Sequence, residues 1–163
     1  MAGEPLLRRN VAGFVFVEDN EPPQAPKNLR NSYEAATLAI ANTADIPVLQ
    51  LRGADLRKLL AEEAVLSRIA ELKRRVLLLA GGLLEGAVTQ IALSALVEGF
   101  DVFVAADLVW TVEPGREPLF FDRITHSCGH VLTRRQVLLE LLAQEKDVEK
   151  RERLQALLTG AAG

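Results

Sequence analysis

Apolar residues in this chain gather in short continuous runs that alternate with longer segments of mixed polarity. Five runs are too short for helices and suit strands buried on both faces of a sheet: 12–18, 46–51, 76–80, 101–105 and 130–133. The intervening segments carry apolar residues at helical spacing, at 26–44, 55–75, 86–98 and 120–127. This alternation predicts a three-layer α/β/α fold around a parallel sheet. We expect five strands, with six as the alternative, in the spatial order 2-1-3-4-5.

The last part of the chain, 134–158, also has a helical pattern, with a break near Asp147. One helix is needed to cover the sheet, so we interpret the chain from about residue 145 as a C-terminal helical extension. It is either an oligomer contact or a helix that packs back on its own domain. The length of 163 residues fits one well-buried core, and we therefore treat 1–163 as a single domain.

The composition narrows the class of protein. Hydrophobic residues at 49% and charged residues at 25% are typical of a globular domain, and a net charge of −3 gives no support for a nucleic-acid partner. No apolar run reaches the ~18 residues of a membrane span, so we expect no membrane association. One cysteine excludes an intrachain disulfide, and no N-terminal segment resembles a signal peptide. We expect a cytoplasmic protein.

The stretch 74–108 organises the chain as strand, turn, helix and strand. Gly81 and Gly82 end the first strand and allow backbone conformations that other residues resist, and Gly99 is a suitable helix stop. Glu85 lies near the helix start, where the helix dipole favours a carboxylate. Because ligands of open parallel sheets bind at the carboxyl ends of the strands, we expect any site to include the turn 81–87.

These residues resemble the isochorismatase-like cysteine hydrolases, the superfamily that includes nicotinamidases and N-carbamoyl amidohydrolases. Ala80-Gly81 matches the family's strand end, and the turn continues through Leu83, Leu84, Glu85 and Gly86. The segments ALSALVEGFDVFVAADL and RITHSCGHV extend the similarity, which covers roughly 12–142. In the family the nucleophilic cysteine lies six residues after the glycine, a position that Ala87 occupies here.

The resemblance also implies a carboxylate base at the end of the first strand. Glu18 is the best match to the family's aspartate, with Asp19 as the competing candidate and Asn20 at the following polar position. The alternative interpretation is that these residues solvate a strand-end loop. Substrate-binding candidates are Asn20, Leu84, Glu85, Gly86 and Trp110; the tryptophan lines a pocket or an interface, or else covers the core edge.

The family carries a lysine on a long loop after the second strand, where it orients the base. That loop is shortened here, and Lys58 is the nearest candidate by position. Arg52 and Arg57 are the competing cations. A lysine on a helix is more often a solvated surface residue, which is the alternative interpretation of Lys58.

The only cysteine, Cys128, lies between His126 and His130. A metal site or a thiol–imidazole pair would use such residues. Three ligands so close in sequence do not converge easily, however, and the chain has no further cysteine or histidine. We therefore expect Cys128 to be a half-buried packing residue, and we expect no metal and no cofactor.

Together, Ala87, Glu18 and the short loop favour a hydrolase homologue without the cysteine mechanism, a pseudoenzyme. We expect it to bind a small molecule or to act as a homo-oligomer, a dimer or larger. The alternative is an active thiol-independent hydrolase of a small amide or enol ether, with Glu18 as acid or base. A third class, an interaction module, would use the charged C-terminal helix.

Overall fold

The computed structural model describes residues 7–18, 27–52 and 64–160. Within them a parallel sheet has the strand order β2-β1-β3-β4-β5, which confirms the expected topology. Its strands are β1 (Ala12–Glu18), β2 (Val48–Arg52), β3 (Val76–Ala80), β4 (Asp101–Ala105) and β5 (His130–Leu132). Strand β2 begins later than expected, since Pro47 has no N–H for the ladder. Strand β5 ends before Thr133, whose hydroxyl caps the next helix.

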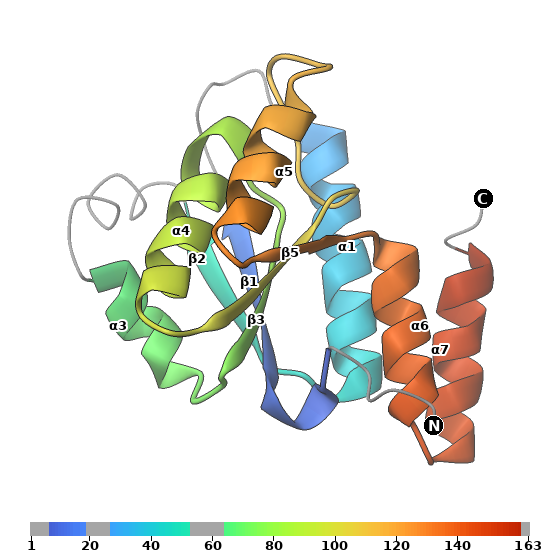
Figure 1. Ribbon diagram of the computed structural model, residues 1–163. Coiled ribbons are helices and arrows are strands. Elements are labelled where there is room, and N and C mark those ends of the chain that lie inside the picture. Colours follow the sequence, from blue (N-terminus) through green and yellow to red (C-terminus); the bar gives the residue numbers. More distant parts are fainter. Residues whose placement is uncertain (1–6, 19–26, 53–63, 161–163) are drawn as a thin grey trace.

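Helices cover both faces of the sheet (Figure 1). One layer contains α1 (Lys27–Ala44), α6 (Arg134–Gln144) and α7 (Val148–Gly160). The other contains α3 (Ala64–Glu71), α4 (Thr89–Val97) and α5 (Glu117–His126). A short 3-10 turn, η1 (Arg9–Val11), precedes β1, and a π-helical turn, η2 (Leu84–Val88), precedes α4. The predicted three-layer α/β/α arrangement is confirmed, and no described helix is both long and apolar enough to cross a membrane.

Each face of the sheet has its own apolar cluster, because successive strand side chains point to opposite faces. Phe14, Phe16 and Leu78 pack with α1, α6 and α7 in what we call the α1-side cluster. Val15 and Val17 pack with α3, α4 and α5 in the α4-side cluster. Burial on both faces explains why β1 and β3 are continuous apolar runs.

The C-terminal helix α7 packs back against α1 and α6. Leu154 and Leu158 are buried in the α1-side cluster. Between α6 and α7 the buried Glu145 carboxylate accepts hydrogen bonds from the backbone N–H groups of Lys146 and Asp147, at 3.1 and 3.0 Å. This turn explains the break that the sequence pattern predicts near Asp147.

Candidate functional site

The turn after β3 is pressed against the carboxyl end of β1. Gly81 has a φ of +94°, and a Cβ there would lie 2.5 Å from the Phe16 ring and 2.7 Å from the Val17 carbonyl oxygen. A Cβ on Gly82 would lie 2.7 Å from Val17 Cγ1. Only glycine fits at such close approach. The two glycines therefore bring the turn beside the end of β1, where Glu18 lies.

The loop after β4 pairs with the same turn. The Gly81 N–H donates to the Leu108 carbonyl at 2.5 Å, the Leu84 N–H to the Trp110 carbonyl at 2.8 Å, and the Trp110 N–H to the Gly82 carbonyl at 3.1 Å. Trp110 is only 6% exposed, and its indole Nε1 is buried without a hydrogen-bond partner among the described residues. Trp110 thus covers the core edge and also places an unused donor near the turn.

Glu85 anchors this loop to the turn. Its Oε1 accepts from the Thr111 hydroxyl and from the N–H groups of Val112 and Glu113, the last two at 3.1 and 3.3 Å. Its Oε2 is buried and has no hydrogen-bond partner in the described part of the chain. The sequence did not reveal this anchoring role; the only signal was a carboxylate near the helix start.

Ala87 lies inside the π-helical turn η2 and is 4% exposed. It belongs to the α4-side cluster with Val17, Leu84 and Val88. The N–H groups of Gly86 and Val88 both donate to the Leu83 carbonyl, at 3.1 and 3.3 Å. Those two amides are therefore already used within the turn and are not free to stabilise an oxyanion.

Glu18 is the last residue of β1 and is paired in register with Arg52. Its side chain is 35% exposed, and its Oε2 lies 3.8 Å from Arg52 Nε. Strand alternation puts Glu18 on the face of Phe14 and Phe16, the α1 side. The structure thus brings Leu84, Glu85, Gly86, Ala87 and Trp110 together, but it directs the Glu18 side chain to the opposite face from Ala87.

A row of polar contacts continues from Glu18 toward α1. Arg52 Nη2 donates to Gln50 Oε1 at 3.3 Å, and Gln50 Nε2 donates to Glu34 Oε1 at 3.2 Å. Arg52 is one of the cations that compete with Lys58 for the role beside the base. The register of β1 and β2, which end together at Glu18 and Arg52, is the signal that favours Arg52.

Four candidate residues lie outside the described residues: Asp19, Asn20, Arg57 and Lys58.

The expectation that Cys128 is half-buried is wrong, since the residue is exposed. It has a φ of +72° just after α5, and its N–H donates to the Thr125 carbonyl at 3.1 Å. The following Gly129 approaches Ile124, where a Cβ would lie 2.6 Å from Cγ2, so the glycine takes the interior position and Cys128 the outer one. The His130 ring stacks on Phe103, with centroids 4.8 Å apart.

Cys128 also lies at the far edge of the sheet from the turn. It precedes β5, whereas the turn follows β3, and both strands run parallel to β4 between them. Carboxyl ends of parallel strands share one edge, and amino ends share the other. Among the described residues, no group of three or more His, Cys, Asp or Glu side chains could hold a metal ion.

The isochorismatase domain family model matches residues 58–136, which include the turn and extend to the start of α6. The YcaC gene product from Escherichia coli, described as an octameric hydrolase of unknown specificity, superposes with a TM-score of 0.74 over 95% of this chain and 91% of that one, at 21% identity. This chain has the isochorismatase-like fold. Over residues 58–136 its sequence is similar to the isochorismatase domain.

Two other solved structures are similar over nearly the whole chain. YcaC from Pseudomonas aeruginosa, whose structure contains hexane-2,5-diol and covalent acrylamide, has a TM-score of 0.72 and 20% identity, with 95% and 92% of the two chains covered. MAR1 ribonuclease from Caenorhabditis elegans has a TM-score of 0.71 and 17% identity, with 99% and 94% covered. No curated protein matches the chain.

Proposed function

We propose that this protein binds a small molecule at the turn 81–87 and lacks the cysteine-hydrolase mechanism. One observation carries the proposal. The only cysteine in the sequence lies at the opposite edge of the sheet from the turn, and an alanine occupies the nucleophile position that the family resemblance assigns. Loss of a nucleophile lowers turnover by several orders of magnitude. The protein would then be a pseudoenzyme, which binds a ligand at the turn without turning it over.

Two buried polar atoms at the turn support ligand binding. Glu85 Oε2 accepts no hydrogen bond and Trp110 Nε1 donates none among the described residues, although both atoms are buried. A buried polar group without a partner costs about 1–3 kcal/mol. A primary amide offers an N–H to the carboxylate oxygen and a carbonyl to the indole N–H. We therefore assign a small amide or N-carbamoyl compound as the ligand class.

The proposal includes self-association into a dimer or larger oligomer, with the octameric Escherichia coli YcaC gene product as its support. Light scattering coupled to size-exclusion chromatography measures the mass of the particle. The proposal predicts a mass of at least twice the 17.8 kDa of one chain. A particle of one chain's mass across the micromolar range would contradict it.

The competing function is a thiol-independent hydrolase that uses Glu18. Its support is a carboxylate at the carboxyl end of β1, the edge at which ligands of parallel sheets bind. A proton-transfer role needs a carboxylate within hydrogen-bond reach of the substrate. The Glu18 side chain instead lies near Arg52 and on the face opposite Ala87, which favours binding without turnover.

The test is a panel of small amides, N-carbamoyl compounds and isochorismate. Trp110 is the only tryptophan, so saturable changes in protein fluorescence report binding at the turn, while product analysis reports turnover. We expect binding of an amide or N-carbamoyl compound and no product, either from the wild type or from Glu18→Gln and Ala87→Cys.

Each other result overturns a stated part of the proposal. Wild-type turnover that Glu18→Gln abolishes would establish the thiol-independent hydrolase. Product from Ala87→Cys alone would mean that the catalytic scaffold is intact and that only the nucleophile is missing. A flat fluorescence response to the whole panel would contradict ligand binding at the turn.

A further inference from the structure

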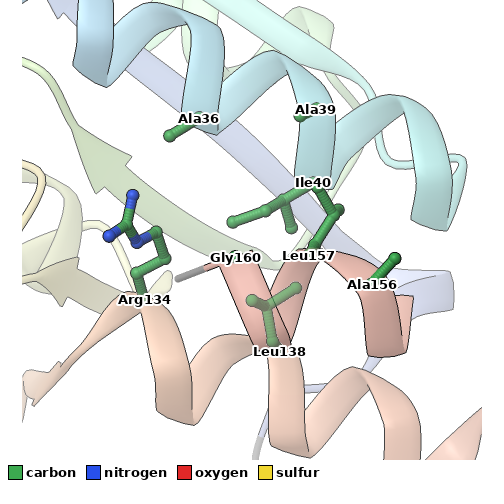
Figure 2. Close-up of a pocket in the computed structure, with 8 residues that line it drawn as sticks. All are labelled: Ala36, Ala39, Ile40, Arg134, Leu138, Ala156, Leu157 and Gly160. Carbon is green, nitrogen blue, oxygen red and sulfur yellow. The ribbon is translucent and has the colours of Figure 1, made fainter. Parts of the chain in front are cut away.

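A pocket lies on the opposite face of the sheet from Ala87, between α1, α6 and α7 (Figure 2). Its volume is about 190 Å³. Most of its lining is apolar and comes from all three helices: Ala36, Ala39 and Ile40 of α1, Leu138 of α6 and Leu157 of α7. The pocket is thus separate from the turn 81–87, and an inference about it does not depend on the proposed function.

Among the described residues that line this pocket, Arg134 alone carries a charge. It is the first residue of α6, and Figure 2 shows its guanidinium directed from α6 into the space below Ala36. Its backbone N–H donates to Asp107 Oδ1 at 2.7 Å. In the described part of the chain the guanidinium itself makes no hydrogen bond or ion pair, and its Nε is buried. Arg134 as a whole is half-buried, and its guanidinium is an unused donor group at an otherwise apolar pocket, so the pocket favours an anion over a cation.

Two other polar groups lie in this neighbourhood. Burial raises the pKa of Tyr33, nearby Asp107 raises it further, and nearby Arg134 lowers it. Both charged side chains therefore lie close enough to act on the Tyr33 hydroxyl. Asp107 is exposed, and its Oδ1 accepts the backbone N–H of Arg134 and not a hydrogen bond from the guanidinium.

The size of the pocket limits the anion. Ordinary ligand pockets of about 300–1,000 Å³ hold drug-sized molecules, whereas an apolar cavity of roughly 150 Å³ holds benzene. We infer that this pocket binds a small aromatic carboxylate of the size of benzoate. The ring occupies the apolar part between the helices, and the carboxylate receives two parallel N–H bonds from the Arg134 fork.

The experiment compares three probes on the full chain by isothermal titration calorimetry and by NMR shift mapping. Benzoate has both the ring and the charge, benzyl alcohol has only the ring, and acetate has only the charge. We expect benzoate to bind at least about tenfold more tightly than either of the others, because charge-assisted hydrogen bonds and apolar burial act together. Amide shifts should concentrate in α1, α6 and α7.

Arg134→Gln should weaken benzoate binding about tenfold or more. Arg135→Gln is the matched control, because Arg135 is the next residue on α6, is exposed and does not line the pocket; it should change the affinity less than twofold. Arg134→Lys keeps the charge without the fork and should give an intermediate affinity. Ala39→Leu should block benzoate by filling the pocket while it leaves Arg134 in place.

Several results would overturn the inference. Equal affinities for benzyl alcohol and benzoate would show that Arg134 does not contribute to binding. Equal affinities for acetate and benzoate would show that the apolar lining does not contribute. Equal losses from Arg134→Gln and Arg135→Gln would exclude the assigned contact. A negative result with benzoate would not bear on the proposed binding of an amide at the turn 81–87, so the two proposals are tested separately.

Discussion

The close approach of the turn to β1 makes a sharp prediction for Gly81→Ala. Gly81 has a φ of +94°, and a left-handed conformation costs a residue with a side chain about 1–2 kcal/mol. The new Cβ would also lie 2.5 Å from the Phe16 ring and 2.7 Å from the Val17 carbonyl oxygen, which belongs to a strand and cannot move freely. Overpacking of this kind costs about 1–3 kcal/mol. The free energy of unfolding should fall by about 2–5 kcal/mol.

Gly99→Ala is the matched control. Gly99 has a nearly identical φ of +92°, but no atom lies within 4 Å of the position of its Cβ. The free energy of unfolding of this variant should fall only by the cost of the left-handed backbone conformation, about 1–2 kcal/mol. Urea denaturation of both variants with a shared m-value gives the difference, which measures the steric part alone. Equal losses in the two variants would refute the packing of the turn against β1.

Further predictions concern charged and titrating groups away from the turn. Glu145→Ala should lower the free energy of unfolding by about 2 kcal/mol in urea denaturation, because the buried carboxylate accepts two backbone N–H bonds and pairs with Arg9. Glu149→Ala is the control: it removes an exposed ion pair and should lower the free energy of unfolding by less than about 0.5 kcal/mol. Similar losses in the two variants would contradict the role of the buried Glu145 carboxylate. Tyr33 is the only tyrosine, so absorbance titration measures its pKa directly. That pKa should lie above that of a free tyrosine and rise further in Arg134→Gln, and an unchanged value would contradict the proximity of the two groups. Because the folded-state pKa of Tyr33 is raised, its contribution to stability is complete below the unfolded pKa and is lost as pH rises through the folded pKa.

The sheet was predictable from the sequence because both of its faces are buried. Five short apolar runs alternate with helical segments, and that pattern left a doubly wound parallel sheet as the consistent arrangement. Strand order and most strand ends agree with the structure. The exceptions have local causes, namely Pro47 before β2 and the Thr133 cap after β5.

The side-chain partners at the site were not predictable in the same way. The anchoring of Glu85 depends on N–H groups 27 and 28 residues further along the chain, and sequence periodicity carries no signal for such contacts. The face to which Glu18 points follows from the register of β1, which a one-residue shift would reverse. The exposure of Cys128 depends on the close approach of Gly129 to Ile124, which only the folded chain reveals.

The most direct test of the central claim measures a thiol rather than a substrate, because it requires no knowledge of the ligand. In an Ala87→Cys, Cys128→Ala double variant, the only thiol occupies the nucleophile position. The rate of its alkylation by iodoacetamide, followed by mass spectrometry across pH, gives its pKa. Ala87 is buried among apolar side chains, so we predict slow alkylation and a thiol pKa at or above the ordinary value of about 8.5. A rapidly alkylated thiol with a pKa below about 7 would show that the turn still activates a thiol, and would contradict a turn that has lost its activating environment together with its nucleophile.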